Sequence, residues 1–559
     1  MKKIFLVFAF VAVIVLGGMA KAQDICTAPV KTESGMIKGL SEKSNKTCVW
    51  RGIPYAAPPI GELRWKAPAP AKAWEGVRDG SVWGAGCLQK GEMNYVNFDP
   101  SGKAGEDCLF LNVWRPQKEG KFPVMFWMHG GGYAGGVGDM PTYWGDRMSQ
   151  AGEVVVVTIN YRLNVFGFLA LPGLRSEDPN KSTGSYGSLD QIAALKWVQK
   201  NIANFGGDPG NVTIFGESAG GWSVCSMMAS PLAKGLFHRA IMESGGCETT
   251  VTLEEGYVAG KAIAEKLGCR QDDLDCLRRL PAKKVLDASY GSLATGFSLL
   301  PNIDNYFLSD TPLAMIQSGK FNNVPFMAGT NLNEANLVLV LDSELGKIKP
   351  DGYQAGLVKF LNISDAEAKE LAKLYPLSAF ENSPKKAMGQ IATDTIFTAP
   401  AYQAMAAASK YQKDVYLYRF DWHNTTLGKT TGAVHSMELS FVFNSNNRKP
   451  WSMLMKNHGK YVEEMETLSQ IVQGYWVGLA KKGNPNGLNI LDWAGKKSGP
   501  VSVGPEWKPF SPDSPYMMVL DKNVRLEPVS KELQDRAAFW ADYNKKHGLF
   551  VKDMGKTKK

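Results

Sequence analysis

Residues 212–221, which read VTIFGESAGG, constrain the fold more than any other stretch of the chain. The first four side chains are β-branched or aromatic and predict a short buried strand, and residues 219–228 predict a helix. Between the two lies a Gly-x-Ser-x-Gly turn, in which Gly216 and Gly220 leave space where side chains would collide. The pattern is typical of a nucleophile elbow, a strained turn that exposes the hydroxyl of Ser218 at the head of a helix.

The alternative interpretation is a glycine-rich turn whose serine only caps the helix. The chain contains 58 glycines, so the five-residue pattern alone is weak evidence. However, no other serine has glycine two residues away on both sides. A helix N-terminus also supplies unpaired N–H groups and a partial positive charge where an oxyanion would form. The strand and the helix around the turn therefore favour a catalytic role for Ser218.

The N-terminus predicts export. Residues 1–3 are Met-Lys-Lys, residues 4–16 are apolar, and an Ala-Lys-Ala site follows. This pattern indicates a signal peptide, residues 1–22, that is cut after Ala22. The apolar run is short for a bilayer span, and Cys26 lies in no lipobox-like context, so we expect no membrane anchor. The mature protein is expected to be secreted or periplasmic, with a signal in the bacterial style.

Residues 23–559 contain no linker, charge run or internal repeat. A single large α/β domain with long insertions is therefore favoured over two domains, and we expect a monomer or a weak homodimer. The formal net charge of +9 is spread along the chain, with a basic tail at residues 552–559. We interpret it as solvated surface and a frayed end, and expect no nucleic-acid binding.

Eight cysteines suit an oxidising compartment. Three pairs are close in sequence and could close loops: Cys26 with Cys48, Cys87 with Cys108, and Cys269 with Cys276. Cys225 lies on the helix behind Ser218 and Cys247 follows a predicted strand, so these two could be free buried thiols. Spacing alone does not fix the connectivity.

Further unbroken apolar runs predict strands at residues 109–114, 124–128, 154–159, 238–242, 324–328 and 415–420. Residues 52–74 are rich in proline and glycine and predict irregular structure. Helices are predicted from an N-cap at Ser188 to Asn204, within insertions at residues 249–320 and 349–411, and over residues 461–480. Apolar strands that alternate with helices indicate a largely parallel sheet covered on both faces.

Residues 129–133, HGGGY, directly follow the predicted strand 124–128. Glycines there would let backbone N–H groups approach a ligand, as an oxyanion hole requires. A flexible glycine turn is the alternative. The position of this loop, one strand–helix unit before the elbow, favours the oxyanion hole.

A nucleophilic serine needs a base, and the base needs an orienting carboxylate. The chain has six histidines. Where a Gly-x-Ser-x-Gly elbow supplies the nucleophile, the acid and then the histidine follow in sequence. Four histidines remain as candidates: His423, His435, His458 and His547. His435 lies in the small-residue loop 431–438, from which an imidazole can reach the elbow, and we assign the other three to packing or surface roles. Glu334, just after the predicted strand 324–328, is the candidate acid, although a solvated helix-start glutamate is the alternative.

The chain resembles the type-B carboxylesterases, the branch of the α/β-hydrolases that includes the cholinesterases. The matching motifs are GIPY at 52–55, EDCLFLN at 106–112, HGGG at 129–132, GGDP at 206–209, GESAGG at 216–221, the Glu334 and His435 segments, and GNPN at 483–486. They extend from about Trp50 to Pro509 and are highly specific together. The resemblance implies an α/β-hydrolase fold, with a central mostly parallel sheet, helices on both faces and long helical insertions over the active site.

The resemblance also implies roles by position. Ser218 would be the nucleophile, His435 the general base and Glu334 the acid. Backbone N–H groups of the oxyanion hole would come from Gly131, Gly132 and Ala219. Buried polar groups around the triad would be Glu217, Ser244 and Glu438. Structural ion pairs would be Arg64 with Glu106 and Arg162 with Asp190. Cys87–Cys108 and Cys269–Cys276 match usual disulfides of the family, whereas Cys26–Cys48 has no such support.

The sequence thus predicts a serine carboxylic-ester hydrolase that acts on small to medium esters through an acyl-enzyme, without metal or cofactor. One alternative is a non-catalytic adhesion or binding module of the same fold, but such members usually lack the serine or the histidine. Another is an enzyme of the same mechanism dedicated to lipid, thioester or amide substrates.

Three residues are candidates for the substrate pocket. Counting back from Cys108, Phe98 stands where cholinesterases carry a tryptophan that stacks on the quaternary ammonium group, and phenylalanine is a weaker cation–π partner. Residues 294–298 resemble the stretch that lines the cholinesterase acyl pocket, and include Thr295 and Phe297. Small Thr295 and Gly296 indicate room for acyl groups larger than acetyl. We therefore expect a general carboxylesterase rather than a choline esterase.

Overall fold

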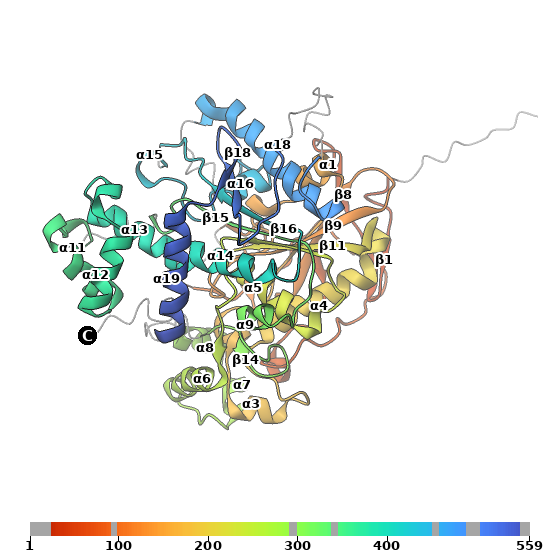
Figure 1. Cartoon of the computed structure of the whole chain (residues 1–559). Coiled ribbons are helices and arrows are strands. Elements are labelled where there is room, and N and C mark those ends of the chain that lie inside the picture. Colours follow the sequence, from red (N-terminus) through yellow and green to blue (C-terminus); the bar gives the residue numbers. More distant parts are fainter. Residues whose placement is uncertain are drawn as a thin grey trace, which may run out of the picture.

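An eleven-stranded sheet runs through the computed structural model, which describes residues 24–90, 98–289, 299–336, 345–426, 428–449, 458–487 and 504–547 (Figure 1). In spatial order the strands are β18 (Arg525–Pro528), β17 (Tyr516–Leu520), β16 (Val415–Phe420), β15 (Phe326–Asn331), β12 (Arg239–Glu243), β11 (Gly207–Glu217), β9 (Phe122–Met128), β10 (Val155–Ile159), β8 (Phe110–Pro116), β4 (Thr47–Pro54) and β3 (Leu40–Glu42). From β17 to β10 all neighbours are parallel, and antiparallel strands lie at both edges.

The sequence located these strands well, because most of their residues are apolar. All six strands predicted besides the elbow strand lie in the sheet, with ends shifted by up to three residues. The elbow strand is longer than expected and spans Gly207–Glu217. The expected helix start was wrong: α4 spans Tyr186–Asn201 with Ser185 at its N-cap, and Ser188 is buried within the first turn. Gly184, at φ 76°, turns the chain into the helix earlier than the sequence indicated.

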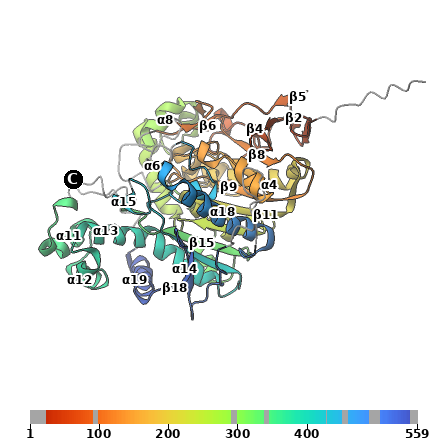
Figure 2. The same ribbon diagram turned by 90° about the horizontal axis from the view of Figure 1, so that it is seen from above.

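The sheet separates two hydrophobic cores, as β9 shows. Phe126 and Met128 belong to one core, whereas Met125 and Trp127 belong to the other, because side chains alternate along a strand. The first face is covered by α4, α5 (Ala219–Ala229) and α14 (Ala399–Ala408). The second is covered by α1 (Asp146–Gly152), α16 (Leu439–Val442) and α18 (His458–Lys482), and Figure 2 shows α18 lying across the sheet.

Two helical insertions extend the sheet domain, as predicted. The first contains α6 (Leu253–Leu267), α7 (Leu274–Arg279), α8 (Ala282–Ser289) and α9 (Pro312–Gln317). The second contains α11 (Tyr353–Leu361), α12 (Asp365–Leu374), α13 (Pro384–Thr393), the π-helical turn η10 (Asp394–Thr398) and α14. Helices α11 to α13 pack with α19 (Lys531–His547) around a third, smaller core on the left of Figure 1.

Four disulfides join the eight cysteines: Cys26–Cys48, Cys87–Cys108, Cys225–Cys247 and Cys269–Cys276. The interpretation of Cys225 and Cys247 as free thiols is therefore wrong. Helix α5 packs on β12, which brings the two Cα atoms to 5.3 Å, within the range that a disulfide spans. This proximity is tertiary, so sequence spacing did not reveal it.

Within the described ranges, no helix is both long and apolar enough to cross a bilayer. The expected signal peptide, residues 1–22, and the basic tail, residues 552–559, lie outside the part of the chain that the structure describes.

Candidate active site

Ser218 occupies a strained turn between β11 and α5. Its φ of 57° and ψ of −123° are unfavourable for a residue with a side chain, which is typical of a nucleophile elbow. A Cβ atom on Gly220 would lie 2.0 Å from the Met128 carbonyl oxygen, and one on Gly216 would lie 2.6 Å from the Gly220 backbone. The two glycines are therefore required sterically, as the sequence predicted. The Ser218 N–H donates to the Glu243 carbonyl oxygen at 3.0 Å, which ties the turn to β12.

The parallel register brings the predicted site residues to one edge of the sheet. Glu217 pairs with Glu243, and Glu243 with Gly329, so β11, β12 and β15 end side by side. Ligands bind at the carboxyl ends of such strands, because the connecting loops converge there. Four segments that follow these ends carry the candidates: the glycine loop after β9, the turn after β11, the Glu334 turn after β15 and the His435 loop beyond β16.

The structure brings the predicted acid and base into direct contact. His435 Nδ1 lies 2.7 Å from Glu334 Oε2. The other oxygen, Glu334 Oε1, accepts from Ser244 Oγ at 2.6 Å and from the Asn331 N–H at 2.7 Å. Glu334 is only 1% exposed, so these donors replace the water that its carboxylate has lost. Such a carboxylate fixes both the tautomer and the orientation of the imidazole.

The second nitrogen of the imidazole faces a carboxylate rather than the serine. His435 Nε2 lies 3.1 Å from Glu217 Oε1, which also accepts from Ser436 Oγ at 2.5 Å. Among the described residues no hydrogen bond joins Ser218 to His435. The His435 side chain remains 27% exposed. Hydrogen bonds to a nucleophile are often long before substrate binds and tighten only in the complex.

The electrostatics of this cluster favour the imidazolium. Burial lowers the pKa of His435, but Glu217 and Glu334 raise it more, and the resulting pKa is about 10. Burial raises the pKa of Glu217. Burial, together with the neighbouring Glu217 and Glu334, raises the pKa of Glu438 well above its ordinary value. A fourth carboxyl, Glu243, has its pKa raised to about 8 by burial.

Glu243, Asn331 and Ser436 were missed by sequence reasoning. Asn331 Nδ2 donates to the Val434 carbonyl oxygen at 2.8 Å and to Glu438, and thereby links β15 to the His435 loop. Glu243 accepts from Trp476 Nε1 at 2.9 Å, while its Oε2 has no partner in the described part of the chain. A glutamate at the end of the strand beside the elbow strand was the one available signal for Glu243.

The glycine loop after β9 combines left-handed backbone angles with N–H groups that are unpaired among the described residues. Gly131 and Gly132 have φ of 105° and 61°. Within the described ranges, no hydrogen bond is donated by the backbone N–H of either residue or of Ala219. Free N–H groups beside a nucleophile can stabilise a developing oxyanion.

The buried side chain of His129 contacts the backbone of this loop. Its Nδ1 lies 2.8 Å from the Gly130 carbonyl oxygen, and its ring stacks on Tyr161 at 4.4 Å. A Cβ on Gly136 would approach Nδ1 to 2.2 Å, so that glycine makes room for the imidazole. Burial lowers the pKa of His129 to about 4, so at neutral pH the ring is uncharged and the contact requires the proton on Nδ1. Because the Gly130 C=O and the Gly131 N–H belong to one planar peptide, His129 also orients the Gly131 N–H.

The pocket candidates are only partly described. Phe98 is half-buried and packs on the second core, whereas Thr295 and Phe297 lie outside the described residues. An aromatic residue that the sequence did not single out, Phe397, contacts the histidine instead: its ring centroid lies 4.7 Å from that of His435.

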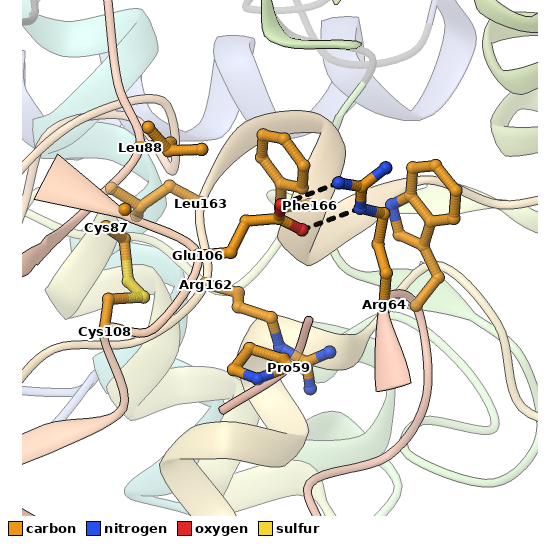
Figure 3. A pocket seen from close by; sticks show the side chains of 11 residues that line it. Pro59, Arg64, Cys87, Leu88, Glu106, Cys108, Arg162, Leu163 and Phe166 are labelled. Atoms are coloured by element: carbon orange, nitrogen blue, oxygen red, sulfur yellow. Dashed lines mark hydrogen bonds and ion pairs between the residues drawn. A yellow bond between two sulfur atoms is a disulfide. The ribbon is translucent and has the colours of Figure 1, made fainter. Parts of the chain in front are cut away.

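A small cavity lies away from this site (Figure 3). It encloses about 10 Å³ beside the Cys87–Cys108 disulfide, which is room for one water molecule at most. Arg64 beside it forms two hydrogen bonds to Glu106, of 2.7 and 2.6 Å. Arg162 forms a buried pair with Asp190 at 2.7 Å. Both pairs agree with the structural ion pairs that the resemblance implies.

In the described part of the chain, no group of three or more His, Cys, Asp or Glu residues could hold a metal ion.

Comparison with known proteins identifies the family. A sequence model of the carboxylesterase family matches residues 27–540. The chain belongs to this family. The para-nitrobenzyl esterase of Bacillus subtilis is 35% identical over 90% of this chain and 97% of its own length. The fumonisin B1 esterase of Sphingopyxis macrogoltabida is 34% identical over 83% of both chains, and the human cocaine esterase is 35% identical over 79% and 80%.

Solved structures show the same architecture. A PNB esterase structure aligns with a TM-score of 0.74 at 34% identity, over 91% of this chain and 99% of the other. A carboxylesterase of Geobacillus stearothermophilus aligns with a TM-score of 0.76 at 31% identity, over 92% and 99%. The fold of this carboxylesterase is therefore the α/β-hydrolase fold, and the protein is a carboxylic-ester hydrolase.

Proposed function

We propose that this carboxylesterase hydrolyses small to medium carboxylate esters through an acyl-enzyme, with Ser218 as nucleophile, His435 as general base and Glu334 as orienting acid. The observation that carries the proposal is the 2.7 Å contact between His435 Nδ1 and Glu334, beside a serine in a strained elbow. This is the arrangement by which a weak serine hydroxyl becomes a nucleophile.

Catalysis begins when the His435 ring turns its Nε2 from Glu217 to Ser218 Oγ. Ser218 Oγ then bonds to the ester carbonyl carbon while His435 takes its proton. The backbone N–H groups of Gly131, Gly132 and Ala219 stabilise the oxyanion of the tetrahedral intermediate. His435 next returns the proton to the leaving alcohol, and water releases the acid by the same steps in reverse.

The relatives are named as esterases of para-nitrobenzyl esters, fumonisin B1 and cocaine, which are chemically unlike. We propose a general specificity, with neutral alcohols preferred over choline because Phe98 replaces a tryptophan. We also propose export after removal of residues 1–22, since four disulfides require an oxidising compartment. Residues 23–559 then form one catalytic domain.

The deciding experiment compares the purified protein with Ser218→Ala on p-nitrophenyl acetate and butyrate, with choline esters alongside. Ser218→Ala should lower kcat by about 10³-fold or more while circular dichroism shows unchanged folding. A folded variant with near-normal turnover would refute the proposed nucleophile. A strong preference for acetylcholine with rejection of butyryl esters would refute the proposed specificity.

A further inference from the structure

A π-helical turn lies against the site on the side of the histidine. Helix α13, the turn η10 and helix α14 follow one another without a break, and the Ala399 N–H donates to the Asp394 carbonyl oxygen five residues earlier. In an α-helix that partner would be four residues earlier, so η10 holds one extra residue. The extra residue changes the direction in which the following side chains project from the helix axis. Such π-helical turns are often found at functional sites.

Phe397 is the residue of η10 that meets the histidine. It is 8% exposed, and its ring is tilted by 37° to the His435 ring at a centroid distance of 4.7 Å. At this distance two aromatic rings are in contact. Glu334 and Glu217 bind the two nitrogens of the imidazole. These two contacts bind the nitrogens at the ring edge, whereas Phe397 packs on the ring and opposes rotation of the imidazole about its Cβ–Cγ bond.

The same helix also touches the turn of the acid. Thr393, the last residue of α13, is buried, and its Oγ1 accepts from the Ala335 N–H at 3.2 Å. Ala335 directly follows Glu334. The segment 393–397 therefore contacts both the histidine and the residue beside its carboxylate partner.

Helix α19 anchors the π-helical turn through Asp394. Asp394 is buried, its Oδ2 accepts from Tyr375 Oη at 2.8 Å, and Arg536 Nη1 lies 3.3 Å from the same oxygen. Trp540 Nε1 donates to Tyr375 Oη at 2.9 Å, so a second residue of α19 completes the network. Removing one partner of a buried charge pair is strongly destabilising, so this network resists movement of η10.

We propose that Phe397 is a positioning residue for ester hydrolysis: it fixes the tilt of the His435 ring, and the Asp394–Arg536 pair holds Phe397 in place from α19. This inference rests on the proposed role of His435 as the general base. Without Phe397 the ring rocks, and Nε2 is less often in line with Ser218 Oγ. The rate of serine attack then falls for every ester, because the defect lies in the base and not in a substrate contact.

The test replaces the ring and keeps an apolar side chain, in Phe397→Leu. The matched control is Phe539→Leu, because Phe539 packs against the third core and meets Trp540 edge-on at 5.2 Å, away from His435. Phe397→Leu should lower kcat/KM about tenfold, equally for p-nitrophenyl acetate and butyrate, since misplacing a catalytic group has a cost of this order. Phe539→Leu should stay within about twofold of the unmodified protein, and Phe397→Tyr, which keeps the ring, should retain most activity.

Two further measurements separate positioning from general packing. In Phe397→Leu the far-downfield proton resonance of the His435–Glu334 hydrogen bond should broaden, because the ring moves between tilts. Asp394→Asn should lower kcat/KM in the same direction but less, and should add nothing to Phe397→Leu in the double variant. Thermal melts identify any variant that has not folded, and Phe397→Tyr and Asp394→Asn keep the question testable if Phe397→Leu fails to fold.

Each result that would contradict the positioning role of Phe397 points to a different explanation. A loss that differs more than about tenfold between acetyl and butyryl esters would make Phe397 a substrate contact, and an equal loss in Phe539→Leu would reduce its effect to packing. Unchanged kinetics and an unchanged resonance in Phe397→Leu would also overturn the proposal. Activity that survives in Ser218→Ala would instead refute the proposed function itself.

Discussion

Replacing Glu217 by glutamine tests the electrostatics of the site most directly. The Glu217 carboxylate lies 3.1 Å from His435 Nε2 and stabilises the imidazolium, so it raises the pKa of His435. Only the neutral imidazole can accept the proton of Ser218. The activity of the unmodified protein should therefore decline on acidification at a pH above about 6.5, the ordinary imidazole pKa. Glu217→Gln should shift this decline to lower pH.

The size of the shift follows from the separation of the charges. Two unit charges 3.1 Å apart attract by about 5 kcal/mol at an effective dielectric constant of about 20. At about 1.36 kcal/mol per unit of pKa, this corresponds to an upper limit of about 4 pH units. Glu217 is itself buried, and its pKa is raised, so part of the attraction is offset. We expect a shift of at least about one unit.

The assay is kcat/KM for p-nitrophenyl acetate between about pH 5 and pH 10, which reports ionisations of the free enzyme. Glu438→Gln is the matched control, because Glu438 also raises the pKa of His435 but makes no direct contact with its ring. Its shift should be smaller and in the same direction. A pH profile that is unmoved in Glu217→Gln, or that moves to higher pH, would refute the assignment of His435 as a base flanked by Glu217.

Two further predictions concern the oxyanion loop and the disulfides. His129→Phe keeps the stacking on Tyr161 but lacks the Nδ1–H donor, so kcat should fall by about 10²-fold with little change in KM. His129→Asn should retain more activity, because its amide can replace that donor. Equal losses of kcat in the two variants would contradict this role of His129. Mass mapping of the non-reduced protein should recover Cys225 linked to Cys247, and detection of either as a free thiol would contradict the structure.

The parts of the fold that depend on local pattern could be predicted from the sequence. The elbow is one example, because its strand, turn and helix are contiguous in sequence. The steric need for Gly216 and Gly220 is visible in the five-residue pattern Gly-x-Ser-x-Gly. The strands of the parallel sheet were also found, since they are largely buried and most of their residues are apolar. Helix starts were less certain, as Ser188 shows, because several serines near a helix start can serve as the cap.

The parts that depend on tertiary contact could not be predicted. Cys225 and Cys247 are brought together only by the packing of α5 on β12. The contact of Phe397 with His435 depends on one extra residue in a helix, which leaves no trace in a hydrophobic periodicity of about 3.6 residues. Glu243 becomes part of the cluster through the register of β12 with β11, and a single sequence does not state that register.

The four buried glutamates around His435 cannot all carry charge, because an unpaired buried carboxylate is costly. Burial raises the pKa of Glu243 to about 8, and burial together with neighbouring carboxylates raises the pKa of Glu438 well above its ordinary value. Glu217 and Glu334 then flank the imidazole, one at each nitrogen. This arrangement opposes the neutral ring in the resting protein, but it stabilises the imidazolium that forms when Ser218 attacks. Glu217→Gln should therefore separate the two effects: activity should persist to lower pH, while the maximal kcat/KM should fall because one of the two carboxylates that stabilise the transition state is gone.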